Sequence, residues 1–212
     1  MKKGLIIASG SIENLDLLEK EIHDHDYVIC ADGGIRYVYG LNVKIDAIIG
    51  DLDSVDDRFP AYIKENKTLL VKHPREKNDT DTELALKYLI EKGYDYITLV
   101  GATGTRMDHT LANIMLLIRY STDKVKVRLI DGNNTIYFTN DYLKLYRKDN
   151  HYLSIIPATR PGVTVSLKGF YYSLENNHIE FGTSLGISNK IIDYTGEIHI
   201  ITGEALVFES RD

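Results

Sequence analysis

Residues 1–133 alternate between short apolar runs and stretches in which apolar side chains recur at helical spacing. The run at residues 4–9 is the first example, and Leu15, Leu18 and Ile22 follow it at intervals of three or four positions. Such spacing gathers side chains on one face of a helix, whereas short apolar runs are typical of buried strands. The same pattern predicts strands at residues 27–31, 47–49, 68–72, 96–100 and 125–130, and helices at 60–66, 84–90 and 111–118. This alternation predicts a doubly wound, mostly parallel α/β sheet, whose ligands bind at the carboxyl ends of the strands.

The pattern changes at about residue 134. From there to residue 212 the chain consists of short apolar runs separated by turns, and none has a convincing helical period. The runs lie at residues 135–139, 152–156, 163–167, 198–202 and 205–209. We therefore predict two domains, an α/β domain at residues 1–133 and a small antiparallel β-sandwich or barrel at residues 134–212.

Two carboxylates follow the apolar run at residues 47–49. Gly50 allows a turn, and Asp51 and Asp53 then lie two positions apart, so that in extended backbone they face the same side. At about 5 Å and an effective dielectric constant near 20, two such charges repel each other by roughly 3 kcal/mol. A magnesium ion, which proteins hold with one or two carboxylates and with substrate phosphates, would offset this repulsion. The alternatives are an acidic turn here and, for Asp32 at the end of another predicted strand, a simple helix cap.

A second polar segment precedes the predicted helix at residues 84–90. Thr80 and Glu83 have the spacing of a capping box, which places Asp79 and Asp81 around the start of that helix. The helix dipole favours acids at this position, so capping alone would account for one of them. Lys77 beside two acids suits a site where phosphate, metal and a cation meet.

The predicted strand at residues 96–100 opens into a glycine-containing loop at residues 101–104. Backbone amides in such a loop can cradle phosphate, and the N-terminus of the following helix favours the anion. Arg106 can hold phosphate oxygens in a planar fork. Taken alone, Asp108 would be a helix cap and His109 a partly buried polar side chain. The loop matches neither the GxGxxG nor the GxxxxGK[ST] pattern.

Composition narrows the classes of function. The 212 residues include 31 acidic and 25 basic side chains, and the net charge of −6 argues against a surface for nucleic acid or for an anionic membrane. No apolar run reaches the roughly 18 residues of a membrane span, and no signal-peptide pattern follows Met1, so we expect a cytoplasmic protein. Cys30 is the sole cysteine, which excludes an internal disulfide and predicts a packed apolar side chain.

Taken together and in order, these motifs resemble those of the thiamine pyrophosphokinase family over nearly the whole chain. They are Asp32-Gly33-Gly34, Gly50-Asp51-Leu52-Asp53-Ser54, Glu76-Lys77 with Thr80-Asp81, Gly101-Ala102-Thr103-Gly104 with Arg106 and Asp108-His109, and Gly186-Ile187-Ser188-Asn189. The resemblance implies an N-terminal α/β catalytic domain, a C-terminal β domain and a homodimer with active sites in clefts between subunits. It also implies transfer of the terminal diphosphate of ATP to the hydroxyl of thiamine, with magnesium, to give thiamine diphosphate and AMP.

The resemblance further implies roles for individual residues. Those implied to hold magnesium and ATP are Asp51, Asp53 and Asp81, with Asp32 near the same phosphates. Those implied to bind or shape the nucleotide site are Lys77, Thr80, Gly101, Thr103, Gly104, Arg106, Asp108 and His109. The expected catalytic residues among all of these are Asp51, Asp53, Asp81, Arg106 and Asp108. Ser188 and Asn189 would line the thiamine pocket, contributed to the partner subunit's site.

The chain departs from the family pattern in two respects. The family usually has an acid directly after the lysine, whereas here Asn78 follows Lys77 and Asp79 comes one position later. Either residue could take that role. The chain also has no tryptophan, so any aromatic ring that stacks on thiamine must belong to a tyrosine or phenylalanine.

Two other functions fit parts of the sequence. The run Asp51-Leu52-Asp53-Ser54-Val55 resembles the nucleophile motif of haloacid-dehalogenase-like phosphatases, which would form an aspartyl phosphate on Asp51. That family normally carries the motif on its first strand, whereas two predicted strands precede it here. The other alternative is a nucleotide and thiamine sensor without catalysis, with the β domain as its output module.

Overall fold

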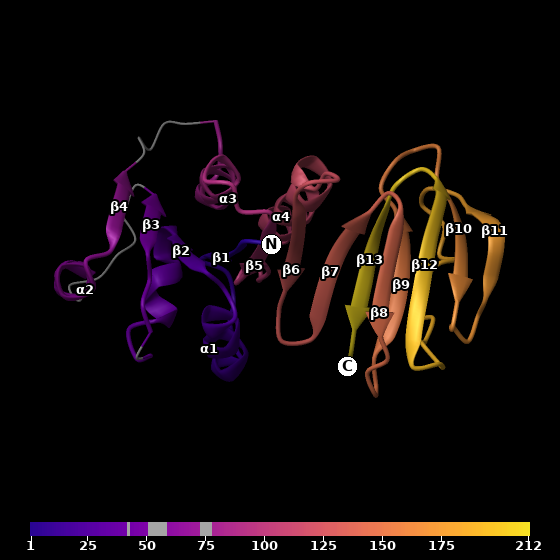
Figure 1. Cartoon of the computed structure of the whole chain (residues 1–212), viewed down its shortest axis with the longest axis horizontal. Helices are drawn as coiled ribbons and strands as arrows, with labels where there is room; N and C mark the ends of the chain where they lie inside the picture. The colour runs from indigo at the N-terminus through magenta and orange to yellow at the C-terminus, as the bar shows by residue number, and fades with distance from the viewer. Residues whose placement is uncertain (42, 51–58, 73–77) are drawn as a thin grey trace. The chain divides into compact units, whose positions relative to one another are not determined.

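The structure is a computed structural model that describes residues 1–41, 43–50, 59–72 and 78–212. The chain divides into two compact units, Met1–Gly132 and Asn133–Asp212 (Figure 1). Each unit contains a cluster of buried apolar side chains. A core of its own is the feature that allows a unit to fold as a domain.

The first unit is built on a parallel sheet. Its described strands are β1 (Lys3–Ile7), β2 (Tyr27–Ala31), β3 (Ala47–Gly50), β4 (Leu69–Lys72), β5 (Tyr96–Val100) and β6 (Lys126–Ile130). They lie in the order β4-β3-β2-β1-β5-β6, and every neighbouring pair is parallel. The order reverses between β1 and β5, and at such a switch point the loops diverge and leave a crevice at the carboxyl ends of the strands. The predicted doubly wound sheet is therefore confirmed.

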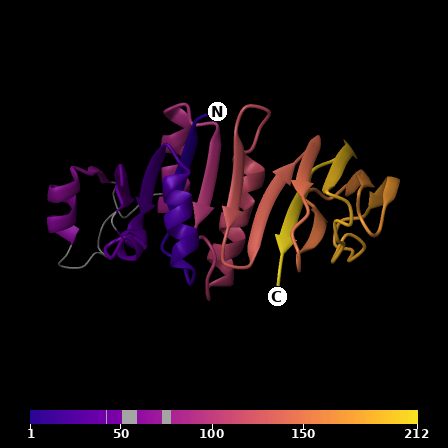
Figure 2. The same ribbon diagram turned by 60° about the horizontal axis from the view of Figure 1, so that its bottom comes forward.

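Helices cover both faces of this sheet (Figures 1 and 2). They are α1 (Leu15–His23), α2 (Phe59–Asn66), α3 (Asp81–Glu91), α4 (Met107–Tyr120) and the 3-10 helix η1 (Asp32–Tyr37). On one face, Leu18 of α1 belongs to the same buried cluster as Leu5 of β1. On the other face, Leu89 of α3 packs so closely on Gly4 that a Cβ atom at Gly4 would be 2.7 Å from its Cδ1. In Figure 2, α1 lies in front of the strands of this unit.

The second unit is an antiparallel β-sandwich. One sheet has the order β7-β13-β9 within this unit, and the other has the order β11-β10-β12-β8. The strands are β7 (Asn134–Thr139), β8 (Tyr142–Tyr146), β9 (Tyr152–Pro157), β10 (Val163–Lys168), β11 (Leu174–Ile179), β12 (Thr195–Thr202) and β13 (Ala205–Ser210). Both sheets contribute to one core, with Ile155 and Val207 from the first and Val165 and Ile198 from the second. The predicted antiparallel β domain is confirmed, and it is a sandwich.

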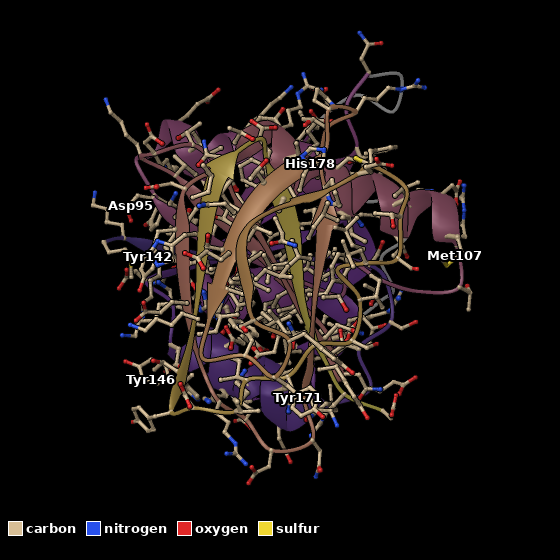
Figure 3. All side chains as sticks on the ribbon, turned by 90° about the vertical axis from the view of Figure 1, so that its right-hand side faces the viewer. Asp95, Met107, Tyr142, Tyr146, Tyr171 and His178 are labelled. Carbon is tan, nitrogen blue, oxygen red and sulfur yellow. The ribbon has the colours of Figure 1, made fainter. Side chains whose placement is uncertain are left out.

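The sequence pattern missed two strands of the sandwich, β8 and β11. Both are edge strands of their sheet. In β11 four consecutive residues are exposed, so apolar and polar positions do not alternate. In β8 only Leu145 is buried, while Tyr142 and Tyr146 project into solvent (Figure 3). An edge strand is covered less completely than a central one, and its sequence therefore carries a weaker apolar pattern.

Cys30 lies in β2 with no exposed surface. Burial raises the pKa of its thiol well above the usual range. This confirms that it packs as a small apolar side chain. None of the helices in the described ranges is long and apolar enough to cross a membrane.

Candidate functional site

A cavity of about 450 Å³ opens at the switch point of the parallel sheet. It lies where the loops that follow β1 and β5 leave the carboxyl ends of these strands, as expected for a ligand site in an α/β sheet. Its lining residues come from four segments of the first unit. They are residues 8–11, Asp32 with Arg36, Thr80 with Thr82, and residues 101–106 with His109, Thr110 and Asn113. Polar side chains and backbone thus surround the cavity.

The loops after β1 and β5 are joined by backbone hydrogen bonds. The N–H of Gly10 donates to the carbonyl of Gly101, and the N–H of Ser11 donates to that of Thr103, both at 2.7 Å. The fit leaves no room for a side chain, because a Cβ atom at Gly10 would be 2.2 Å from the carbonyl oxygen of Thr103. The two loops therefore form one wall of fixed shape. The Ser-Gly-Ser sequence at residues 9–11 was the signal for this loop, but its pattern predicted only the end of the first strand and not a ligand site.

Side chains of α4 fix the second half of the loop after β5. The carboxamide of Asn113 donates to the carbonyl of Ala102 at 2.8 Å, and the hydroxyl of Thr110 accepts from the N–H of Gly104 at 3.2 Å. The hydroxyl of Thr103 donates to Asp131 at the end of β6, at 3.2 Å. The structure thus brings the predicted residues Gly101, Thr103 and Gly104 together in the cavity wall.

The helix α4 begins at the cavity and presents its amino-terminal end there. The N-cap residue Arg106 makes no side-chain hydrogen bond to the first turn of this helix, and the helix dipole favours an anion at this end. The predicted residues Arg106 and His109 both line the cavity. The Nη2 atom of Arg106 donates to Oδ2 of Asp108 at 2.6 Å, and this bond lowers the pKa of the Asp108 carboxyl. Asp108 therefore holds Arg106, and its carboxylate also has a backbone hydrogen bond to His109 in the first turn of the helix.

Two predicted acidic residues, Asp32 and Asp81, approach the end of β3. A Cβ atom added to Gly50 would be 3.2 Å from the Cα of Asp32 and 3.4 Å from the Cγ of Asp81. Asp32 itself has φ of 49°, in the left-handed region that few residues other than glycine, Asn and Asp adopt readily. The approach of two acids to one strand end is the arrangement expected from the sequence.

Three predicted residues, Asp51, Asp53 and Lys77, lie outside the described residues. Among the residues that the structure does describe, no group of three or more His, Cys, Asp or Glu side chains could hold a metal. Carboxylate oxygens are nevertheless the ligands that magnesium prefers, and Asp32 and Asp81 meet at Gly50, directly before Asp51 in the chain. The donor chemistry at this edge fits magnesium.

The start of α3 differs in detail from a capping box. Thr80 caps the helix as expected, because its hydroxyl accepts from the N–H of Glu83 at 3.2 Å. The Glu83 carboxylate instead accepts from the hydroxyl of Tyr120 on α4, at 2.6 Å. Asp79 forms an ion pair of 2.6 Å with Lys87, so its carboxylate is already engaged, whereas Asn78 is exposed.

The second unit contains a separate cavity of about 510 Å³ with a largely apolar lining. Its lining residues include Leu185, Gly186, Ile187 and Asn189 of the predicted thiamine segment and the rings of Tyr171 and Tyr172. These rings meet edge to face, with centroids 4.8 Å apart, and both are exposed. Figure 3 shows Tyr171 at one end of the sandwich. The sequence reading did not single out this pair, although adjacent tyrosines before a predicted loop were a signal.

Asn189 reaches this cavity but uses its carboxamide on the protein itself. Its oxygen accepts from the N–H groups of Tyr172 at 3.0 Å and Lys190 at 2.8 Å, and its amide donates to the carbonyl of Tyr172 at 2.8 Å. The neighbouring Ser188 has φ of 62°, and its N–H donates to the hydroxyl of Ser154 at 3.1 Å. Asn189 therefore holds the tyrosine segment in place.

Two family models match the chain in succession. The model described as thiamin pyrophosphokinase, catalytic domain, matches residues 18–129. The model described as thiamin pyrophosphokinase, vitamin B1 binding domain, matches residues 140–207. Among curated proteins, the chain is 32% identical to thiamine pyrophosphokinase of Bacillus subtilis (strain 168) over 214 residues, which cover 100% of both chains.

Solved structures show the same similarity. The crystal structure of thiamine pyrophosphokinase from Bacillus subtilis has a TM-score of 0.90 and 30% identity, with 100% of both chains covered. That of thiamin pyrophosphokinase from Geobacillus thermodenitrificans has a TM-score of 0.84 and 25% identity, covering 100% of this chain and 98% of the other. The similarity extends over both units of the chain.

Proposed function

The chain belongs to the thiamine pyrophosphokinase family, and from that premise we propose that it transfers the terminal diphosphate of ATP to the hydroxyl of thiamine. The products are thiamine diphosphate and AMP. The hydroxyl oxygen attacks the β-phosphorus, and the bond from that phosphorus to the oxygen shared with the α-phosphate breaks. AMP leaves, and the hydroxyl gives up its proton. The cavity at the switch point, with acids at the neighbouring strand end, is the observation that supports this proposal.

The nucleotide site is proposed to lie in the first unit. The joined loops after β1 and β5 give this site a wall of fixed shape, and the start of α4 has the helix dipole that favours phosphate. The residues proposed to shape this site are Asp32, Thr80, Gly101, Thr103, Gly104 and His109. Lys77 and Arg106 are proposed to neutralise phosphate charge, with Asp108 orienting Arg106 through their bond of 2.6 Å.

Asp51, Asp53 and Asp81 are proposed to hold magnesium. A bound divalent cation would screen the phosphate oxygens and stabilise charge that develops on the leaving group. Asp81 lies at the end of β3, next to Asp32, so it can approach any ion held at that edge. Diphosphate transfer depends on positioning and charge stabilisation more than on covalent chemistry, and these residue types are sufficient for it.

The thiamine site is proposed to involve the cavity of the second unit. Its apolar lining suits a heteroaromatic ring, and Tyr171 and Tyr172 are the candidates for stacking in a chain without tryptophan. Ser188 is proposed to contact thiamine, whereas Asn189 is proposed to act through Tyr172. Residues 1–133 would thus form the catalytic domain, and residues 134–212 would supply the thiamine pocket to the partner subunit of a homodimer.

Family membership favours this reaction over a haloacid-dehalogenase-like phosphatase. The strand that precedes Asp51 is also the third in the chain and lies next to the edge strand β4, not first as in that family. A sensor without catalysis differs from the proposed enzyme only in turnover, so an assay must separate them. The cytoplasmic location stays a prediction.

The experiment is incubation of the whole protein with magnesium, ATP and thiamine, followed by separation of the nucleotides and thiamine esters. We expect AMP and thiamine diphosphate in equal amounts, and neither product when thiamine is omitted. A phosphatase would release inorganic phosphate without thiamine. A sensor would bind both substrates and form no AMP, and either result would overturn the proposal.

A further inference from the structure

We propose that Arg36 is a phosphate-binding residue of the nucleotide cavity, a role that no sequence motif gave it. The proposal rests on the proposed ATP-dependent function. Arg36 lies in η1, and its exposed side chain lines the cavity beside the loops that follow β1 and β5. It therefore comes from a different element than Arg106, which lies at the start of α4.

One nitrogen of the Arg36 guanidinium anchors it to the cavity wall. Its Nη2 atom donates to the carbonyl of Ser9 at 2.5 Å and to the hydroxyl of Tyr37 at 3.1 Å, with the carbonyl of Gly10 at 3.4 Å. The Tyr37 hydroxyl in turn donates to the carbonyl of Gly10 at 2.5 Å. The guanidinium carbon lies 4.8 Å from the centroid of the Tyr37 ring. These contacts hold the charged group at one place on the loop.

The other nitrogens of Arg36 are left for a ligand. A guanidinium has five N–H donors, of which Nη2 carries two. The remaining three, on Nε and Nη1, have no hydrogen-bond acceptor among the residues that the structure describes. A planar group with free donors on two nitrogens matches the oxygens of a phosphate.

The charge of Arg36 is also less compensated than that of Arg106. Arg106 forms a bond of 2.6 Å to the Asp108 carboxylate, which offsets its charge. Arg36 bonds only to carbonyl and hydroxyl oxygens, and it forms no ion pair with a carboxylate of the described residues. Within the described lining of the cavity, Arg36 thus brings a positive charge that is less compensated than that of Arg106. The geometry favours a polyphosphate over an uncharged nucleoside.

The experiment compares the affinities of ATP, AMP and adenosine by calorimetry in the presence of magnesium and without thiamine. The proteins are the wild-type chain, Arg36→Gln, Arg36→Lys, Tyr37→Phe and the control Arg160→Gln, which changes the same charge on an exposed turn of the second unit. We expect Arg36→Gln to weaken ATP binding by about tenfold to a hundredfold, the range for a lost charge-assisted hydrogen bond. Adenosine binding should change by less than about twofold, and the control should match the wild type.

The variants separate phosphate binding from loop support. Tyr37→Phe removes a bond to the loop and one acceptor of the Arg36 guanidinium without removing charge, so its loss of ATP affinity should be smaller than that of Arg36→Gln. Arg36→Lys should recover part of the ATP affinity. An equal loss of ATP and adenosine affinity in Arg36→Gln, or no loss of ATP affinity, would overturn the proposal. Because binding needs no turnover, selective loss of ATP affinity would support the role of Arg36 even if the wild-type chain formed no AMP.

Discussion

The Nζ atom of Lys87 lies 2.6 Å from Oδ2 of Asp79, so the acid that precedes α3 is paired with a residue of the second turn of that helix. This ion pair raises the pKa of Lys87 and keeps it charged. Asp79 therefore supports the start of the helix, on which Asp81 is placed. Of the two candidates for the acid position of the family, Asp79 is engaged elsewhere, and Asn78 carries no charge.

The ion pair predicts that Asp79→Asn keeps most activity. We expect turnover within about threefold of wild type and a loss of stability below about 1 kcal/mol, because an ion pair that is partly exposed contributes little. Lys87→Gln removes the other partner of the ion pair and should show the same small changes in turnover and stability. Steady-state kinetics and thermal unfolding measure both. A tenfold or greater fall in kcat for Asp79→Asn alone would show that this carboxylate acts in the reaction.

Asp81→Asn and Asp53→Asn are expected to abolish most activity while leaving the fold intact. Loss of a magnesium ligand should lower kcat by about a hundredfold, equivalent to roughly 3 kcal/mol of transition-state stabilisation. Magnesium titrations of ATP-dependent thermal stabilisation should show weaker binding in both variants. The control is Asp123→Asn, in the exposed turn after α4. If Asp81→Asn showed wild-type turnover at saturating magnesium, Asp81 would not be a magnesium ligand of the reaction.

Gly10→Ala is expected to disrupt the joined loops. The new Cβ atom would be 2.2 Å from the carbonyl oxygen of Thr103, and backbone atoms of both loops would have to move. We expect a loss of about 1–3 kcal/mol in the free energy of unfolding, the usual effect of overpacking, together with weaker ATP binding. Gly40→Ala is the control, because its Cβ atom would meet nothing within 4 Å. Equal stability of the two variants would contradict the close fit.

The fold could be predicted from the sequence because most of its elements have a clear apolar period. The spacing of Leu15, Leu18 and Ile22 predicted α1, and uninterrupted apolar runs predicted the central parallel strands. The strands that were missed, β8 and β11, are edge strands whose exposed faces weaken the pattern. Burial, not strand propensity alone, therefore determines which strands a sequence pattern can reveal.

Part of the site was also predictable, because carboxyl ends of parallel strands meet at one edge of a sheet. This brought Asp32 and Asp81 together at Gly50. The sequence could not show that Asp79 pairs with Lys87 or that Arg36 turns toward the loop after β1. These partners depend on side-chain directions and tertiary packing, which cannot be predicted from the spacing of residues in the sequence.

His25 predicts a pH dependence of stability. Its Nδ1 atom donates to the carbonyl of Glu21 at 2.6 Å, and Nε2 lies 2.8 Å from the hydroxyl of Thr98, an arrangement that suits the neutral ring. Burial, the largest cause, lowers the pKa of His25 below its ordinary value of 6.5. Between the lowered and the ordinary pKa the unfolded chain binds more protons, so stability rises with pH there. The contribution is complete above pH 6.5 and is lost as the pH falls.

His25→Gln should therefore flatten the dependence of the unfolding free energy on pH below about 6.5, since the group that titrates is gone. Denaturant unfolding at a series of pH values measures this. His23→Gln, at the exposed end of α1, is the control and should keep the wild-type slope. The same slope in His25→Gln as in wild type would assign the pH dependence to other groups.

Asn189→Ala tests whether the tyrosine segment must be held in place for thiamine to bind. The variant removes the side-chain partner of three partly buried backbone groups, at Tyr172 and Lys190, and because water can reach these groups the loss should lie at or below about 1 kcal/mol for each. We expect lower thermal stability and a KM for thiamine raised by about tenfold, with the KM for ATP within about twofold. Asn189→Asp keeps the acceptor oxygen and should recover part of the thiamine affinity. Asn140→Ala, in an exposed turn before β8, is the control. An unchanged KM for thiamine in a destabilised Asn189→Ala would mean that these bonds support the sandwich alone, because a role in positioning Tyr172 must appear in thiamine binding.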